Sequence, residues 1–187
     1  MAGNRQAIAL IAGLMTRPEE AWRSMHALAP TAGWIAAALV APLAAVVALA
    51  WSTGILLTPL RPQASPAFLI TLITTFVLCF AAIAMLALAM AALLPMYERP
   101  RDWHRSWLVA AGSATPMLLS GALLFYPMFI MVMVIATPYA AFLVFLGAQQ
   151  MLGVAPADAT EFTAASMLTG ALASVALGGV MAAIGLV

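Results

Sequence analysis

Residues 66–94 read PAFLITLITTFVLCFAAIAMLALAMAALL, an apolar run without a single charged side chain. A helix needs about 20 such residues to cross a bilayer, because the hydrocarbon core is roughly 30 Å thick and each helical residue rises about 1.5 Å. The strands of a membrane barrel would instead alternate polar and apolar residues. This stretch therefore predicts a transmembrane helix.

Four further runs of the chain have the same character. In chain order, the predicted spans are Ala29–Trp51, Pro66–Leu94, Trp107–Phe125, Pro127–Leu146 and Ala164–Leu186. The composition agrees, because the chain is 66% hydrophobic and only 7% charged, whereas soluble domains carry roughly 25% charged residues. We expect an all-α, polytopic membrane bundle of about five transmembrane helices, with kinks at Pro42, Pro116 and Pro138.

The segment before the first span has a different pattern. Thr16-Arg17-Pro18-Glu19 predicts a capping box that opens a short helix. One face of this helix is apolar and includes Trp22, whereas Arg17, Glu20 and Arg23 lie on the other face. An amphipathic helix of this kind lies in the headgroup region, where Trp22 would contact lipid. We therefore expect one domain, in which residues 1–28 form a cytoplasmic or interfacial helix and residues 29–187 form the five-helix bundle.

The distribution of arginine predicts how the chain is oriented. The seven basic residues are all arginine: Arg5, Arg17, Arg23, Arg61, Arg99, Arg101 and Arg105. A cytoplasmic N-terminus places all but Arg61 on the cytoplasmic side, as the positive-inside rule requires. The absence of lysine and the abundance of alanine indicate a bacterial genome rich in G and C. We expect a multi-pass protein of the bacterial inner membrane, with Val187 on the periplasmic side.

The densest polar stretch is the predicted connection between the second and third spans, Glu98 to Arg105. Its side chains Arg99, Arg101, His104 and Arg105 are candidates for contact with a cytoplasmic protein partner or with lipid headgroups, as is Trp22. A simpler interpretation makes the stretch an anchor that fixes the topology of the two spans.

The fifth span carries a ladder of small residues, each four positions after the last: Gly170, Ser174, Gly178 and Ala182. Small residues let two helix backbones approach closely. We interpret this ladder as internal helix packing, with a contact between copies in an oligomer as the second interpretation. The general abundance of alanine and glycine explains the same pattern without any special role.

The residues that enzymes need are missing from the predicted spans. None contains Asp, Glu, His, Lys or Arg, whereas catalysis and ion coupling in a membrane need such groups. Cys79 is the single cysteine, and His26 and His104 stand alone, so no metal site is expected. The net charge of +1 gives no basic surface for nucleic acid. We predict no enzymatic activity, no cofactor and no nucleic-acid partner.

The chain resembles the Yip family (Ypt/Rab-interacting protein domain), which has many bacterial members. The resemblance begins at residues 16–22, TRPEEAW, continues through residues 105–111 and 115–119, and ends with residues 139–159. It implies five membrane helices, a cytoplasmic N-terminus and no enzymatic activity. Eukaryotic relatives are linked to Rab GTPases, but the long cytosolic region that they use is missing here, so that role is not expected.

Two functions follow from these patterns. The first is a non-enzymatic membrane protein that organises or recruits partners at the inner membrane, because nearly all of the charge lies on one side. The alternative is a passive conduit for lipid or small solutes, which the internal prolines and the cluster Thr71, Thr74 and Thr75 would suit.

Overall fold

A computed structural model describes residues 2–57, 65–126 and 130–183 of the chain. All regular structure in these residues is helical, and they contain no strand. The helices are α1 (Ala2–Thr16), α2 (Pro18–Leu28), α3 (Ala32–Ile35), η1 (Ala36–Val40), α4 (Ala41–Leu57), α5 (Ser65–Leu93), η2 (Leu94–Tyr97), α6 (Trp103–Ser113), α7 (Thr115–Gly121), α8 (Ile130–Gln150) and α9 (Ala159–Ala183).

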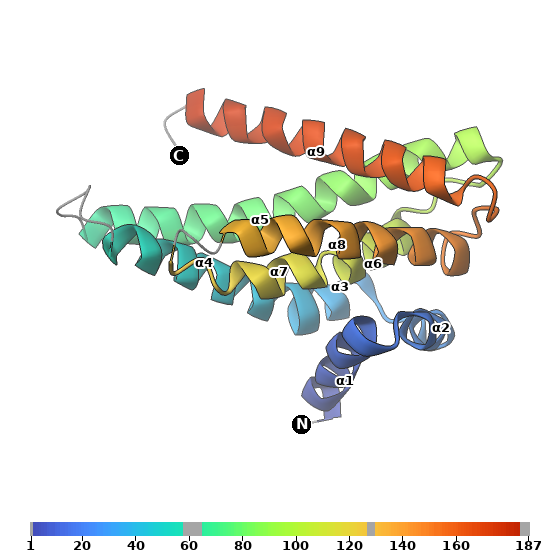
Figure 1. The fold of residues 1–187 in the computed structure, drawn as a ribbon, viewed down its shortest axis with the longest axis horizontal. Helices are drawn as coiled ribbons and strands as arrows, with labels where there is room; N and C mark the ends of the chain where they lie inside the picture. Colours follow the sequence, from blue (N-terminus) through green and yellow to red (C-terminus); the bar gives the residue numbers. More distant parts are fainter. Residues whose placement is uncertain (1, 58–64, 127–129, 184–187) are drawn as a thin grey trace.

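The long helices run back and forth along one common direction (Figure 1). Within the described residues, four helices are long and apolar enough to cross a membrane: Ala32–Ile55, Phe68–Tyr97, Met131–Gln150 and Ala159–Val180. They correspond to the first, second, fourth and fifth predicted spans. The protein is therefore an all-α membrane bundle that crosses the bilayer several times. The start of the fourth predicted span, Pro127, and the end of the fifth, residues 184–186, lie outside the described residues.

The third predicted span, Trp107–Phe125, is wrong as a single helix. The structure divides this part of the chain into α6 and α7, which meet at Ala114. Pro116 lies in the first turn of α7, where its missing N–H leaves no hydrogen bond unmade. We expected a kink at Pro116, and the structure shows a break between two helices at this place. Figure 1 shows α6 and α7 continuing one another along the bundle beside α8.

The other two internal prolines have different effects. Directly before Pro42, the first span contains one π-helical segment, η1, between α3 and α4. A π-turn relieves the missing hydrogen bond and the ring clash that proline causes one turn earlier. Pro138, by contrast, lies inside α8, which continues through it from Ile130 to Gln150.

The N-terminal helices α1 and α2 lie across the direction of the bundle, beside one of its ends (Figure 1). The predicted helix at Pro18 is confirmed as α2, with the proline in its first turn. The predicted capping box is wrong, because residue 17 is the N-cap and its side chain makes no capping hydrogen bond. Thr16 instead belongs to α1, and its hydroxyl donates to the carbonyl of Ala12 at 2.8 Å. The helix expected over residues 1–28 is divided at residue 17 into α1 and α2.

Close packing surrounds the indole of Trp22, which is fully buried. The ring lies against Gly112 of α6 and Gly147 of α8, and a Cβ built on either glycine would come within 3.2 Å of it. We call these two glycines the Trp22 socket. The expectation that Trp22 contacts lipid or a partner is therefore wrong: the apolar face of α2 packs on the protein's own membrane helices.

The small-residue ladder of α9 packs closely against another helix at its first position. A Cβ added at Gly170 would lie 3.1 Å from Cα of Leu86, so the backbones of α9 and α5 approach closely there. Ser174 bonds back to the carbonyl of Gly170 at 2.8 Å, and nothing lies within 4 Å of a Cβ at Gly178. The side chain of Ala182 lies outside the described residues.

Candidate functional site

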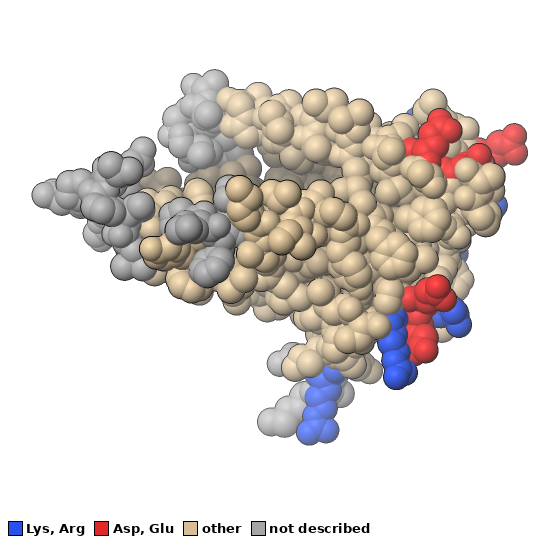
Figure 2. All heavy atoms as spheres, viewed as in Figure 1, with Lys and Arg blue, Asp and Glu red and all other residues tan. Residues whose placement is uncertain are grey.

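The charged side chains gather at one end of the molecule. In the part of the chain that the structure describes, they lie where the α5–α6 and α8–α9 connections meet, or on α1 and α2 beside that end (Figure 2). Apart from the grey atoms, the remaining surface in this view is uncharged. Arg61, expected on the opposite side, lies outside the described residues. The polar end is therefore where a functional surface is to be sought.

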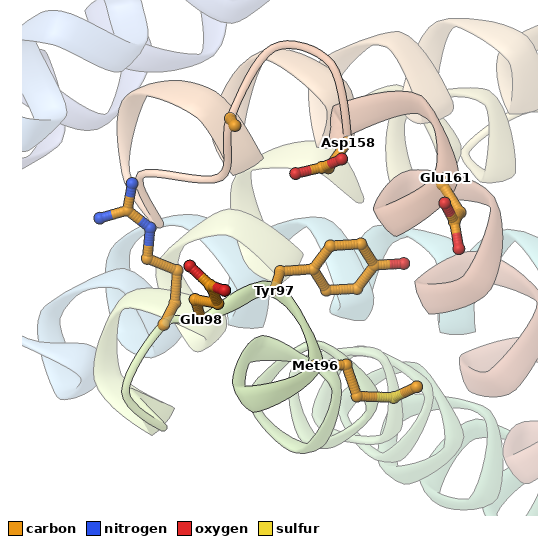
Figure 3. A pocket seen from close by; sticks show the side chains of 7 residues that line it. Met96, Tyr97, Glu98, Asp158 and Glu161 are labelled. Carbon is orange, nitrogen blue, oxygen red and sulfur yellow. The ribbon is translucent and has the colours of Figure 1, made fainter.

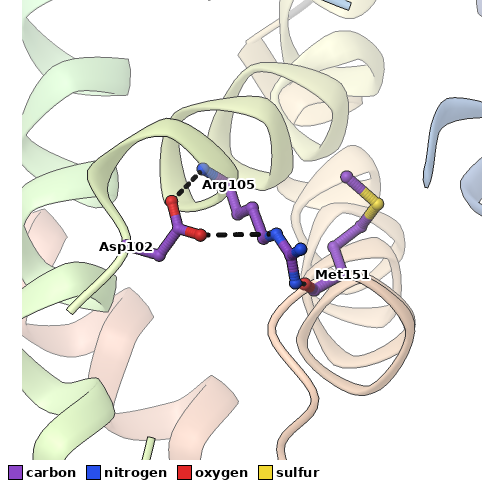
Figure 4. Close-up of polar contacts among 3 residues, drawn as sticks. All are labelled: Asp102, Arg105 and Met151. Atoms are coloured by element: carbon purple, nitrogen blue, oxygen red, sulfur yellow. Dashed lines mark hydrogen bonds and ion pairs between the residues drawn. The ribbon is translucent and has the colours of Figure 1, made fainter. Parts of the chain in front are cut away.

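Arg105 joins the two connections at this end. Its backbone N–H donates to Oδ1 of Asp102 at 2.9 Å, which caps α6. Its guanidinium pairs with the same carboxylate at 3.3 Å and donates to the carbonyl of Met151 at 3.3 Å (Figure 4). Met151 directly follows α8, so Arg105 fixes the end of α8 to the start of α6. This geometry matches the anchoring interpretation of the loop.

Arg99 lies against the same α8–α9 connection at a second point. A Cβ added at Gly153 would lie 3.4 Å from Nη1 of Arg99. Gly153 has φ +70°, a left-handed conformation that side chains other than glycine adopt at a cost. The backbone conformation at residue 153 thus favours glycine. The side chain of Arg99 packs over this turn, where glycine has no side chain of its own.

Arg101 and His104 differ from these two residues. Both are exposed, and neither forms an ion pair with any described residue. Trp103 between them is 45% exposed, and its ring lies 6.2 Å from that of Trp107. Arg99 is also exposed and forms no ion pair with a described residue, but it lies against Gly153. Of the four predicted contact residues between positions 99 and 105, Arg101 and His104 are therefore the two for which no contact with the described α8–α9 connection is found.

A surface pocket of about 680 Å³ opens between the two connections (Figure 3). It is lined by Met96, Tyr97, Glu98, Arg99, Ala155, Asp158 and Glu161. Figure 3 shows the hydroxyl of Tyr97 directed toward Glu161, and its ring meets that of Phe162 edge to face at 5.3 Å. With three carboxylates against one guanidinium, the pocket carries a net negative charge and favours cationic groups.

Sequence reasoning missed the acidic half of this pocket. Asp158 and Glu161 stand out in the sequence only as a helix start, since Asp158 directly precedes α9 and Glu161 lies in its first turn. Their meeting with Glu98 depends on how α5 and α9 pack, which no local pattern reveals. Within the described residues, no group of three or more His, Cys, Asp or Glu side chains could hold a metal ion.

Comparison of the chain with family models, with curated proteins and with solved structures finds no match in any of the three.

Proposed function

We propose that this membrane protein is a non-enzymatic adaptor of the bacterial inner membrane, which recruits a protein partner to its charged end. The observation that carries the proposal is the segregation of charge in Figure 2, where described charged residues occupy one end and its flanking helices. The positive-inside rule makes that end cytoplasmic. The N-terminus would then be cytoplasmic and the C-terminus periplasmic.

The resemblance to the Yip family belongs to the same proposal. The path of the chain along the bundle supports it, since α6 and α7 together occupy the place of the third predicted span. The family would supply a fold and a non-enzymatic role, and it would leave the identity of the partner open.

The composition of the charged end suits a protein partner. Met96 is 76% exposed and Trp103 is 45% exposed, and Trp103 stands between Arg101 and His104 in the sequence. Methionine, aromatic residues and arginine are the types enriched at protein interfaces. The adjacent acidic pocket adds the opposite charge, so the partner surface should present both a basic and an acidic group.

The test is capture of the tagged, full-length protein from membranes in mild detergent, followed by mass spectrometry. We expect a stoichiometric partner that is lost in the triple variant R101A/W103A/H104A. The matched control is R17A/R23A, because those arginines are exposed on α2 and already paired with Glu20 and Glu19. A partner retained by the triple variant, or an equal loss in the control, would count against this surface.

The rival function, a passive conduit, predicts a polar path among the spans. The pocket between α4 and α5, about 280 Å³ in volume, is instead lined by apolar side chains: Ala45, Ala48, Leu49, Leu72, Ile73 and Phe76. Purified protein in liposomes should therefore leave the rates of dye leakage and lipid flip at the protein-free level. Flux that scales with the amount of protein would replace the adaptor hypothesis with the conduit.

A further inference from the structure

A second pocket lies away from the polar one, between the crosswise N-terminal helices and the start of the first span. Its volume is about 390 Å³. Gln6 and Leu10 come from α1, Met25 and Leu28 from α2, and the remaining lining residues are Ala29, Pro30, Thr31 and Trp34. We call this pocket the N-terminal groove.

The chain itself fixes the depth of this groove in the membrane. The first span begins at Ala32, and the hydroxyl of Thr31 caps it by accepting from the N–H of Trp34 at 3.2 Å. The groove therefore lies where the span leaves the hydrocarbon core. Helices α1 and α2 run across the bundle at this level (Figure 1), as helices at a membrane interface do. A tryptophan at position 34 suits the same depth.

The lining of the groove is mostly hydrocarbon. Of its eight residues, only Gln6 and Thr31 are polar, and the Thr31 hydroxyl already serves as a helix cap. Leu28 at the rim is 72% exposed. The apolar lining thus runs from an exposed side chain to Trp34 at the start of the first span, so hydrocarbon of the surrounding bilayer can enter the groove without crossing a polar barrier.

A cation stands next to this hydrocarbon lining. Arg17 and Arg23 on α2 are paired with Glu20 and Glu19, at 3.6 and 3.0 Å. Arg5 directly precedes the lining residue Gln6, is exposed, and forms no ion pair with any described residue. An unpaired guanidinium at headgroup level complements a lipid phosphate.

We propose that the N-terminal groove binds one phospholipid of the cytoplasmic leaflet, with an acyl chain along Leu10, Met25 and Leu28 and its phosphate at Arg5. The bound lipid would fill the space between α1 and the first span. This inference goes beyond the adaptor function and does not depend on a protein partner, so either proposal can fail alone.

The test uses full-length protein in nanodiscs that contain phosphatidylglycerol with a photoreactive diazirine on its acyl chain. After illumination, mass spectrometry locates the adducts. We expect adducts on the groove residues to exceed those on Leu168 of α9 at least fivefold, although Leu168 is 64% exposed. Adducts at equal density on the groove and on Leu168 would mean ordinary bilayer contact and would overturn the proposal.

Two variants that block the groove sharpen this measurement. Leu28→Glu places a charge at the rim, and Gln6→Trp fills the groove with a neutral side chain. Both should lower groove adducts at least fivefold, whereas the control Ile8→Glu, at an exposed site outside the lining, should leave them within twofold. Leu28 and Gln6 are both exposed, so the two groove-blocking variants should keep the fold. Size-exclusion chromatography checks this. Undiminished adducts in folded variants would contradict the proposal.

A third variant tests the phosphate contact. Arg5→Gln should lower labelling by the phosphatidylglycerol probe at least threefold while labelling at Leu168 stays constant. Equal labelling of wild type and variant would show that Arg5 does not contribute to lipid binding. Crosslinks between two copies of the protein through groove residues would show that a second copy, rather than lipid, occupies the groove.

Discussion

A Cβ added to Gly112 would lie 2.6 Å from Cη2 of Trp22, closer than two nonbonded carbon atoms can approach. The indole of α2 thus occupies the space that an alanine side chain on α6 would need. Gly112→Ala must push α2 away or distort α6, and overpacking of this kind costs about 1–3 kcal/mol. We expect a lower midpoint of thermal unfolding in detergent, and Gly178→Ala, which has open space around its Cβ, serves as the control.

A double variant tests whether the clash is the cause. The Nε1–H of Trp22 has no hydrogen-bond partner among the described residues, so Trp22→Phe removes ring volume without breaking a bond. In the Trp22→Phe background, Gly112→Ala should cost at least 1 kcal/mol less than in the wild type, as a positive coupling in a double-mutant cycle. Additive effects of the two changes would contradict direct contact.

The close approach of α9 to α5 gives a prediction of its own. Gly170→Ala places a Cβ 3.1 Å from Cα and Cδ1 of Leu86, so part of the contact is with backbone that cannot rotate away. We expect a loss of about 1 kcal/mol in the free energy of unfolding. The same change at Gly178 should cost nothing. Equal effects at the two positions would mean that the ladder packs as a whole, as in an oligomer.

Tyr139 tethers the N-terminal helix to the bundle. Its hydroxyl lies 2.8 Å from the carbonyl of Leu14 and 3.2 Å from that of Met15, both in the last turn of α1. Tyr139→Phe removes this donor, and a hydrogen bond of this kind contributes about 1 kcal/mol. We expect faster hydrogen exchange of the α1 amides, with the exchange of α9 unchanged. Exchange of α1 at the wild-type rate would show that the tether is not needed.

Arg105 of α6 and Arg101 of the α5–α6 connection should behave differently. Arg105→Ala removes the bond to Met151 and the pair with Asp102, and because this side chain is 50% exposed we expect a loss of only about 1 kcal/mol. Arg101→Ala should leave stability unchanged and weaken partner capture. Thermal unfolding and the pull-down measure the two effects separately. Equal destabilisation by both variants would refute the division of roles.

Backbone strain at Glu98 offers a stabilising change. This residue ends η2 with φ 58°, a left-handed conformation that costs a non-glycine residue about 1 kcal/mol. Glu98→Gly relieves the strain, and the greater entropy of glycine in the unfolded chain offsets part of the gain. We expect a small rise in the unfolding midpoint, with Glu98→Ala as the control that keeps the strain. A fall in both variants would mean that the carboxylate itself stabilises the loop, and a fall in the glycine variant alone would contradict the relief of strain.

Hydropathy was enough to predict the membrane bundle, because long apolar runs such as residues 66–94 have few other folded solutions. The sequence correctly indicated that Pro116 disturbs the helix. It could not distinguish a kink from the break that the structure shows at Ala114. The amphipathic pattern also predicted α2, yet misplaced Trp22. An apolar helix face does not reveal whether lipid or protein will cover it. In α2 that face packs on the protein's own helices rather than on lipid.

The charged end shows a similar limit. The sequence identifies Arg99, Arg101, His104 and Arg105 as one cluster, whereas the structure divides them by their neighbours. Arg105 donates to the backbone carbonyl of Met151. Every residue has such a carbonyl, so the sequence does not indicate which one accepts this bond. The acidic pocket was missed for the same reason, since Glu98 and Asp158 line one pocket only after α5 and α9 have packed.

The Trp22 socket has a consequence for how the protein is made. Synthesis proceeds from the N-terminus, so the indole leaves the ribosome long before either glycine that encloses it. The socket is incomplete until α8 has entered the membrane. Helix α2 must therefore wait, with its large aromatic ring uncovered, and can reach its final place only after α8 does.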